Sequence, residues 1–406
     1  MKYLEGGVCA AKGFRANGIH CGIRKNKTKR DLALIVSDVP ASAAGVYTTN
    51  LVKGAPLIIT RSHVTKGKIS AIICNSGNAN TCNSNGAEVA IETCRELAAR
   101  LGTSEEEIAV ASTGVIGLPM SSTPIVNGMK ELIGGLRRSA EGSSFAAEGI
   151  MTTDTIKKEV AVEFELGGKT CRIGGIAKGS GMIHPNMATM LVFITSDVAI
   201  TPDALQTSLS RDVVDSFNMI SVDGDTSTND MVLVLANGAA GNPEISGEGE
   251  NLDVFRAALR AVTSRLCRMI ASDGEGATKL LECTAHGAKD DETARIAAKS
   301  VVCSSLLKAA MFGADANWGR VLCAIGYSGA DIDVDSVGIA SESAAGRIVV
   351  CENGLGVDFS EELAKKILLE PEITIDVSLG DGEGKASAWG CDLTYDYVRI
   401  NGDYRT

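Results

Sequence analysis

The sequence has few aromatic residues, no closely spaced cysteine pair and no long apolar run. Aromatic side chains make up 4% of its 406 residues, which disfavours a surface on which nucleic-acid bases stack. Acidic residues outnumber basic ones by 50 to 39, and the net charge of −11 argues against nucleic acid or an anionic membrane as a partner. No stretch approaches 18 apolar residues, and the N-terminal residues lack the apolar segment of a signal peptide. We therefore expect a cytoplasmic protein that binds neither nucleic acid nor membrane.

Metal and redox motifs are missing as well. None of the twelve cysteines forms a C-x-x-C pair, which excludes zinc ribbons and thioredoxin-type motifs. The four histidines lie far apart, without Cys or His at metal-ligand spacing. Cysteines in apolar runs, such as Cys74, Cys303 and Cys323, are expected to be small buried hydrophobes. We therefore expect free thiols in a reducing compartment and no bound metal.

The composition and length are typical of a globular protein. Hydrophobic residues make up 45% of the chain and charged residues 22%, enough for a sizeable core and a solvated surface. The length is about 2.7 times a typical domain of roughly 150 residues, so two or three compact units are expected. The 45 glycines indicate many tight turns and close backbone approaches.

Strand and helix patterns are mixed along the chain, which indicates an α/β protein. Strands are expected at 31–37, 69–74, 159–166, 190–196, 231–237 and 373–379. Helices are expected at 87–101, from Thr201 toward Met219, at 253–271 and at 292–312. Thr201 as N-cap and Pro202 at the first helical position define the start of the second helix. The Gly/Ser-rich stretches 139–149 and 239–251 are predicted to be loops.

Two motifs resemble ligand-binding loops but lack required residues. Gly168–Thr170 would end a phosphate-binding loop only if glycine stood at Glu163, so it is better interpreted as a hairpin turn. Asp223–Asp230 would begin a calcium loop only with glycine at Thr228 and glutamate at Val234. The acidic run is therefore a polar turn or a loop that lines a site.

The segment from Lys178 to Thr195 allows two interpretations. A Gly-Ser-Gly loop leads to Pro185, and Thr189 then opens an apolar strand. The common interpretation is a loop followed by a strand-initiating threonine. The alternative is a chain that cleaves itself so that Thr189 becomes a new first residue. Its α-amine, with a pKa of about 7.7–8.0, would be neutral often enough to act as a local base for the hydroxyl.

An ordered set of motifs carries a resemblance to one family over essentially the whole length. The chain resembles the ornithine acetyltransferases, also called glutamate N-acetyltransferases, of the cyclic arginine pathway. The motifs are AAGVYTTN (43–50), NSGNAN (75–80), ASTGVIG (111–117), MTTDT (151–155), AKGSGM with PNMATML (177–191), DGDTSTND (223–230), SDGEGATK (272–279), DANWGR (315–320) and NGDYRT (401–406).

The resemblance implies self-cleavage, a fold and an assembly. The cut falls between Ala188 and Thr189, giving an alpha chain of residues 1–188 and a beta chain of residues 189–406. The two chains remain together as one intertwined unit and pair into an α2β2 assembly. The implied fold is an α/β (α+β) fold, an αββα-type stacked sandwich with a smaller α/β lobe, shared with certain self-processing aminopeptidases.

The resemblance also implies the roles of individual residues. Thr189 is the nucleophile, and Thr113 with Gly114 forms the oxyanion hole, where a hydroxyl and a backbone N–H stabilise developing charge. Lys178 pairs with a substrate carboxylate and Glu275 with the ammonium groups of ornithine. The full set of substrate contacts is Thr152, Lys178, Thr189, Glu275, Asn401 and Thr406.

The implied activity is transfer of an acetyl group from N2-acetylornithine to glutamate through acetyl-Thr189, without metal or prosthetic group. Acetyl-CoA is expected as a second donor. Three alternatives stay open: an N-terminal-threonine amidohydrolase or aminopeptidase that uses water, a monofunctional transferase without acetyl-CoA activity, and a non-catalytic metabolite-binding protein.

Overall fold

A computed structural model describes residues 1–184 and 190–402. The chain divides into two compact units. Within the described residues, unit 1 comprises 1–179, 190–214 and 226–266, and unit 2 comprises 180–184, 215–225 and 267–402. Each unit thus contains segments from both sides of the predicted cleavage site, so the unit boundaries do not follow the predicted alpha and beta chains.

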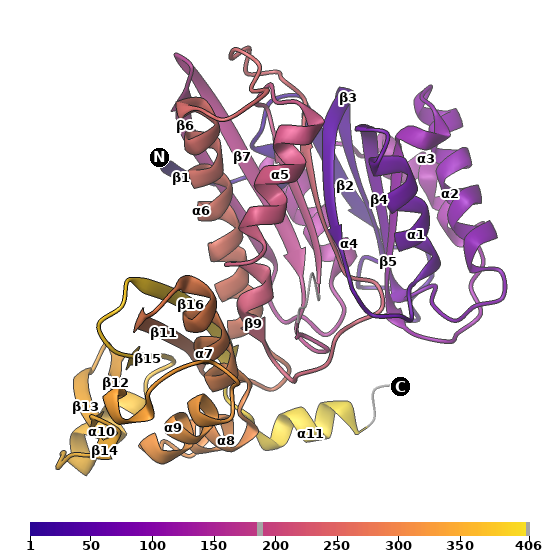
Figure 1. The fold of residues 1–406 in the computed structure, drawn as a ribbon. Helices are drawn as coiled ribbons and strands as arrows, with labels where there is room; N and C mark the ends of the chain where they lie inside the picture. The colour runs from indigo at the N-terminus through magenta and orange to yellow at the C-terminus, as the bar shows by residue number, and fades with distance from the viewer. Residues whose placement is uncertain (185–189, 403–406) are drawn as a thin grey trace. The chain divides into compact units, whose positions relative to one another are not determined.

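Unit 1 is built on a nine-stranded mixed sheet (Figure 1). The strand order is β1-β6-β7-β8-β10-β3-β4-β5, and β2 pairs with one half of the long strand β3. The β8–β10 and β4–β5 pairs are parallel and the others are antiparallel. The bounds are β1 Lys2–Leu4, β2 Phe14–Ile19, β3 Leu32–Tyr47, β4 Lys68–Asn78, β5 Ile108–Val115, β6 Lys158–Leu166, β7 Lys169–Lys178, β8 Leu191–Ser196 and β10 Met231–Ala236.

The apolar runs predicted as strands occupy the middle of this sheet. All six residues of β8 and all six of β10 are buried, as expected for strands covered on both faces. The predicted strand 31–37 is the first half of β3, which continues to Tyr47 beyond an irregularity in its pairing with β4 between Val36 and Ala41. The predicted hairpin turn lies at Gly167–Gly168, between β6 and β7.

Helices cover both faces of the unit 1 sheet. On one face, α2 and α3 pack residues such as Leu97 and Met129 against Leu34 of β3. On the other face, α4 packs Ala146 and Ile150 into a second apolar cluster. The bounds are α1 Ala55–Val64, α2 Gly86–Leu101, α3 Thr123–Gly134, α4 Ala140–Ile150, α5 Pro202–Asp212 and α6 Glu250–Ser272, the last of which lies in unit 1 up to Leu266.

The edge strand β5 is covered by α1. The Thr60 hydroxyl donates to the carbonyl of Val110 at 2.6 Å and accepts from its N–H at 2.7 Å. The side chain of His63 bonds the carbonyl of Ile108 at 2.7 Å. A helix thus satisfies backbone groups that an exposed sheet edge would leave free.

The prediction of a loop at 139–149 is wrong, because this segment is helix α4. Its glycines weaken helix propensity, but they let the helix approach the sheet closely. A Cβ on Gly142 would lie 2.6 Å from the carbonyl oxygen of Ala16, and one on Gly149 would lie 3.0 Å from that of Leu32. Tertiary packing therefore decides the structure here. The stretch 239–251 is largely irregular, as predicted, until α6 begins.

Two predicted helices have different ends in the structure. The helix that begins after Thr201 ends at Asp212 and does not reach Met219. The single helix predicted at 292–312 is two helices, α7 Asp291–Cys303 and α8 Ser305–Phe312. Between them Ser304 is extended, and its hydroxyl accepts from the N–H of Leu307 at 3.3 Å. A serine cap inside an apolar periodic pattern therefore starts a new helix.

Unit 2 contains a seven-stranded sheet in the order β14-β13-β12-β15-β11-β16-β9. Helix α7 packs against β11 and β16. The strands are β9 Ile220–Ser221, β11 Leu280–Ala288, β12 Gly338–Ser343, β13 Gly346–Glu352, β14 Leu355–Gly356, β15 Glu372–Ser378 and β16 Gly384–Cys391, and the remaining helices are α9 Trp318–Gly326, α10 Glu361–Leu368 and α11 Tyr395–Asn401. Two mixed sheets with packed helices confirm the predicted α/β class.

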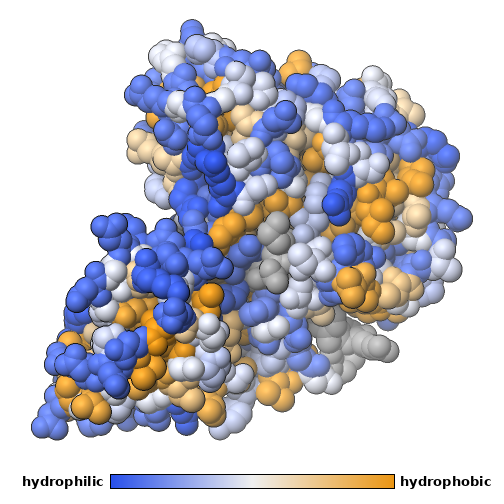
Figure 2. All heavy atoms as spheres, in the orientation of Figure 1, coloured by the Kyte–Doolittle hydropathy of each residue, from blue (hydrophilic) through white to orange (hydrophobic). Residues whose placement is uncertain are grey.

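The surface and the cysteines agree with most of the expectations from composition. Hydrophilic side chains cover most of the face shown in Figure 2. None of the helices in the described ranges is long and apolar enough to cross a membrane.

All twelve cysteines are free thiols. Cys74 is buried as predicted, whereas Cys303 is half-buried and Cys323 is exposed, because Cys323 faces away from the packed side of α9.

Candidate active site

The predicted oxyanion residues lie at the end of β5, beside the end of β4. In the parallel register Ser76 is opposite Thr113, and Gly77 is opposite Gly114. Thr113 is 8% exposed. Gly114 has φ of 132°, and a Cβ there would lie 2.4 Å from the carbonyl carbon of Gly77. Only glycine allows this close approach, so the Thr113–Gly114 turn has a defined and confined backbone.

Asn229 holds the strand that carries Thr113. Its side-chain amide donates to the carbonyl of Ser112 at 3.0 Å and to that of Ala79 at 2.6 Å. Its side-chain oxygen accepts from the hydroxyls of Thr81 at 2.6 Å and Thr228 at 2.5 Å. Asn229 is buried, and both donors and both acceptor positions of its amide are used. This network supports the predicted oxyanion turn.

The sequence did not assign Asn229 a role. It lies in the acidic run that the sequence left as a polar turn or a site-lining loop, and the structure favours the second interpretation. The sequence feature that pointed to a site-lining loop was the position of this acidic run among the family motifs. The contact itself could not be predicted, because Asn229 and Ser112 are 117 residues apart.

A buried carboxylate organises the segment around Thr152. Asp154 accepts from the N–H groups of Thr152 at 2.9 Å and Gly179 at 2.8 Å, and it forms an ion pair of 2.7 Å with Lys158. Both side chains of the ion pair are fully buried. Burial by itself would raise the pKa of Asp154, but the ammonium groups of Lys158 and Lys178 and these hydrogen bonds outweigh it and lower the pKa to about 2. Asp154 is therefore ionised and joins the Thr152 segment to the end of β7.

Lys178 is the last residue of β7 and pairs in register with Leu191 of β8. It is 8% exposed, so it is not the solvated loop lysine that its sequence context alone suggests. The Lys178 ammonium acts electrostatically on Asp154 and on Asp230. Burial raises the pKa of Asp230 well above its usual range, and the charge of Lys178 opposes this rise. Lys178 is therefore a buried cation near two acidic groups.

In unit 2 the structure brings Glu275 and Asn401 together. The Asn401 side-chain amide donates to a carboxylate oxygen of Glu275 at 2.7 Å. The backbone N–H of Glu275 donates to the carbonyl of Ser180 at 2.9 Å. A Cβ on Gly181 would lie 2.3 Å from the Glu275 carboxylate, so the Gly-Ser-Gly loop is shaped to accommodate this side chain. Glu275 is nearly buried, at 7% exposure, and is not an ordinary turn residue.

The predicted site residues therefore fall into three groups. Thr113, Gly114, Thr152 and Lys178 lie in unit 1, and Glu275 and Asn401 lie in unit 2. Ala188, Thr189 and Thr406 lie outside the described residues. Within the part of the chain that the structure covers, no group of three or more His, Cys, Asp or Glu side chains is placed to hold a metal ion.

Known proteins resemble this chain over nearly its full length. The model of the ArgJ family matches residues 15–406. The arginine biosynthesis bifunctional protein ArgJ 1 of Clostridium acetobutylicum is 50% identical over 97% of this chain and 96% of its own length. The arginine biosynthesis bifunctional protein ArgJ of Caldanaerobacter subterraneus is 49% identical over the full length of both. The crystal structure of the Bacillus halodurans ArgJ protein is 46% identical, covers 52% of this chain and 97% of that chain, and has a TM-score of 0.49.

These similarities define the class of protein as an arginine-biosynthesis acetyltransferase with an α/β fold. The chain belongs to the ArgJ family. Membership confirms the family and the type of enzyme predicted from the sequence. The alternative of a non-catalytic metabolite-binding protein is thereby set aside.

Proposed function

We propose that the chain transfers the acetyl group of N2-acetylornithine to glutamate through an acetyl-Thr189 intermediate. The observation that carries this proposal is the buried Asn229 network, which fixes the strand end bearing Thr113 and Gly114. A preorganised pair of donors is what stabilisation of a tetrahedral oxyanion requires, since donors that are already placed need no reorganisation during the reaction.

The chemistry proceeds in two balanced steps. The Thr189 hydroxyl oxygen attacks the acetyl carbonyl, its proton passes to the Thr189 α-amine, and the oxyanion accepts from the Thr113 hydroxyl and the Gly114 N–H. The C–N bond breaks, and ornithine leaves with the proton from the α-ammonium group. The amine of glutamate then attacks the carbonyl of acetyl-Thr189 and loses a proton to the Thr189 α-amine. The ester C–O bond breaks, the α-ammonium returns that proton to the Thr189 oxygen, and N-acetylglutamate leaves.

The other predicted residues bind substrate. Lys178 pairs with a substrate carboxylate, and Thr152, held by Asp154, contributes a hydroxyl. Glu275 binds the ammonium groups of ornithine and is oriented by Asn401. Thr406 completes the predicted contacts.

The protein also matures by self-cleavage and uses a second acetyl donor. The chain cleaves itself between Ala188 and Thr189, and the products of residues 1–188 and 189–406 remain together as α2β2 in the cytoplasm. No metal or prosthetic group takes part. Acetyl-CoA also acetylates Thr189 and supplies N-acetylglutamate directly. The relatives from Clostridium acetobutylicum and Caldanaerobacter subterraneus are named bifunctional proteins, which supports two activities.

The test is a product assay with each donor. Purified protein with glutamate and acetylornithine should yield N-acetylglutamate and ornithine in equal amounts, with the parallel-line kinetics of a covalent intermediate. Acetyl-CoA in place of acetylornithine should yield N-acetylglutamate and free CoA. Release of acetate without N-acetylglutamate would instead show the amidohydrolase alternative, in which water is the acceptor. Transfer from acetylornithine alone would show the monofunctional alternative.

A further inference from the structure

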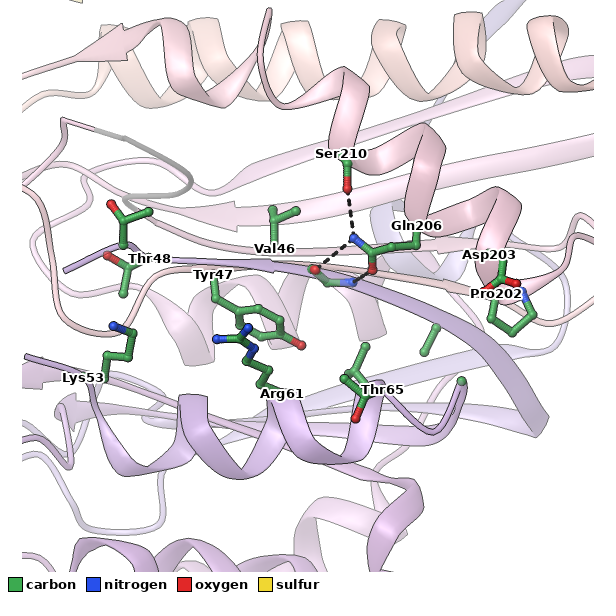
Figure 3. A pocket seen from close by; sticks show the side chains of 15 residues that line it. Val46, Tyr47, Thr48, Lys53, Arg61, Thr65, Pro202, Asp203, Gln206 and Ser210 are labelled. Carbon is green, nitrogen blue, oxygen red and sulfur yellow. Dashed lines mark hydrogen bonds between the residues drawn. The ribbon is translucent and has the colours of Figure 1, made fainter. Parts of the chain in front are cut away.

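Unit 1 contains a groove that none of the predicted site residues lines. Its volume is about 640 Å³, within the range of small-molecule sites of roughly 300–1,000 Å³. It lies between the second half of β3, helix α1 with the turn after it, and helix α5 (Figure 3). The lining residues are Ala43, Gly45, Val46, Tyr47, Thr48, Thr49, Lys53, Arg61, Val64, Thr65, Gly67, Pro202, Asp203, Gln206 and Ser210.

The strand edge in this groove is held by a side chain. The Gly45 N–H donates to the side-chain oxygen of Gln206 at 3.0 Å, and the Gln206 amide donates to the Gly45 carbonyl at 3.2 Å and to the Ser210 hydroxyl at 3.0 Å. In Figure 3 the bond between Gln206 and Ser210 lies within α5, and the other two run from Gln206 to the strand. The amide replaces a neighbouring strand at this one residue. Gln206 therefore fixes the walls of the groove, and its side chain does not fill the groove.

Tyr47 lines the groove, and its hydroxyl is unsatisfied. Its oxygen is buried and has no hydrogen-bond partner among the described residues. Burial raises the pKa of Tyr47, so the hydroxyl keeps its proton and can donate. A buried hydroxyl without a partner lowers stability, and each such group in a native protein needs an explanation. A bound ligand that accepts from Tyr47 would supply one.

Two cations line the same groove. Arg61 is exposed, and no carboxylate of the described chain forms an ion pair with it. The Lys53 ammonium donates to the carbonyl of Asn50 at 2.5 Å and has no carboxylate partner in the described ranges either. Figure 3 shows Tyr47 reaching from β3 and Arg61 from α1, with Asp203 at the other end. In a protein of net charge −11, two uncompensated cations beside a hydroxyl donor favour an anionic ligand.

Tyr47 lies close in the sheet to β8, the strand that begins two residues after the predicted nucleophile Thr189. Tyr47 is opposite Met231 in the β3–β10 pair. The N–H of Met231 donates to the carbonyl of Met190 at 2.9 Å, and Met190 directly follows Thr189 in the sequence. One strand, β10, therefore separates Tyr47 from the chain that follows Thr189. The groove therefore lies two strands along the sheet from β8, which begins two residues after Thr189 in the sequence.

We infer that this groove binds the coenzyme A portion of acetyl-CoA, with Arg61 and Lys53 pairing with its phosphates and the Tyr47 hydroxyl donating to an amide carbonyl of its pantetheine arm. The inference rests on the proposed second donor. It makes Arg61, Lys53 and Tyr47 the residues that select this donor, and it leaves the acetylornithine reaction to the residues already described.

The experiment compares the two donors in Arg61→Ala, Tyr47→Phe and a control, Lys130→Ala. Lys130 is an exposed cation on α3 and does not line the groove. Loss of a hydrogen bond to a charged group weakens binding about tenfold or more. Arg61→Ala should raise KM for acetyl-CoA about tenfold relative to KM for acetylornithine, and Lys130→Ala should leave that ratio unchanged.

Tyr47→Phe separates a ligand contact from a structural role. It removes only the unpartnered hydroxyl, so the thermal unfolding midpoint should stay the same or rise while KM for acetyl-CoA increases. Equal changes with both donors, or none with either, would overturn the inference while the second donor stands. If the unsubstituted protein uses acetylornithine but makes no N-acetylglutamate from acetyl-CoA, the second donor is lost and the inference falls with it.

Discussion

The side-chain amide of Asn229 donates a hydrogen bond to the carbonyl of Ser112 across 117 positions of sequence, at 3.0 Å. Because Ser112 directly precedes Thr113, this bond sets the position of the predicted oxyanion donor. Asn229 itself precedes Asp230 and strand β10, which is paired with β8. Two motifs from opposite sides of the predicted cleavage site are therefore joined within unit 1.

The first prediction concerns Asn229→Asp. A carboxylate cannot donate to the two carbonyls that the amide now satisfies, and each lost partner costs about 1–3 kcal/mol. Unfolding in urea should show a lower stability, and kcat should fall more than KM rises, since the predicted oxyanion turn loses its support. Asn353→Asp, at an exposed turn, is the matched control and should change neither. An unchanged kcat in a folded Asn229→Asp protein would contradict the assigned role.

The second prediction concerns Thr113. Removal of one oxyanion donor lowers turnover by about 10²–10³-fold, so Thr113→Ala should lose that much kcat with little change in thermal stability. Thr113→Ser keeps a hydroxyl and should retain much more activity. The two variants should also differ in the rate of self-cleavage, because attack on the peptide bond passes through a similar oxyanion. Equal activity of the serine and alanine variants would remove Thr113 from the reaction.

The third prediction concerns maturation. The purified protein should consist of two pieces of 188 and 218 residues (406 − 188 = 218), with Thr189 as the first residue of the second piece by N-terminal sequencing. Thr189→Ala should remain one chain and be inactive, because the hydroxyl that attacks is gone. Thr189→Ser keeps a hydroxyl and should still be cut. Cleavage of the alanine variant at the same bond would refute the proposed role of Thr189.

The fourth prediction concerns pH. The pKa of Asp154 is about 2 in the folded protein, below its ordinary 3.8, so its ionised form contributes stability above about pH 4. That contribution should be lost as the pH falls from about 4 toward 2. Urea unfolding at several pH values should show the decline.

Asp154→Asn tests the origin of this decline. It removes the carboxylate that pairs with the buried Lys158 ammonium and should cost about 3–5 kcal/mol at neutral pH, with a flatter acid profile. Asp38→Asn, which breaks the more exposed pair with Arg138, should cost about 1 kcal/mol or less. The same steep acid decline in Asp154→Asn would show that other carboxylates cause it.

The fifth prediction concerns Glu275. Glu275→Gln keeps the shape of the side chain and its bond to Asn401 but loses the charge that binds ornithine ammonium groups. KM for acetylornithine should rise about tenfold or more, in line with the strength of hydrogen bonds to charged groups. Glu361→Gln, exposed on α10, is the control. Initial rates at varied acetylornithine concentration measure this KM. An unaltered KM would exclude Glu275 as a substrate contact.

Local sequence determined the elements whose signals lie within a few residues. The apolar runs of β8 and β10 predicted buried strands, since a strand covered on both faces needs no polar alternation. Thr201 and Pro202 marked the start of α5, and the ordered motifs identified the family. Through that resemblance the sequence also predicts which residues form the oxyanion hole and bind substrate.

Only the tertiary structure decided the features that depend on partners far away in the chain. Gly142 and Gly149 oppose a helix locally, yet α4 forms and packs close to the sheet, where a Cβ would lie 2.6 Å from the Ala16 carbonyl oxygen at Gly142 and 3.0 Å from that of Leu32 at Gly149. Asp154 is strongly acidic because strand pairing brings Lys178 near it and burial encloses Lys158. The Asn229 side chain bonds the backbone carbonyl of Ser112 because the fold brings together segments that are 117 residues apart in the sequence. Periodicity and capping act between neighbours, whereas close approach, burial and electrostatics arise only when the strands have assembled.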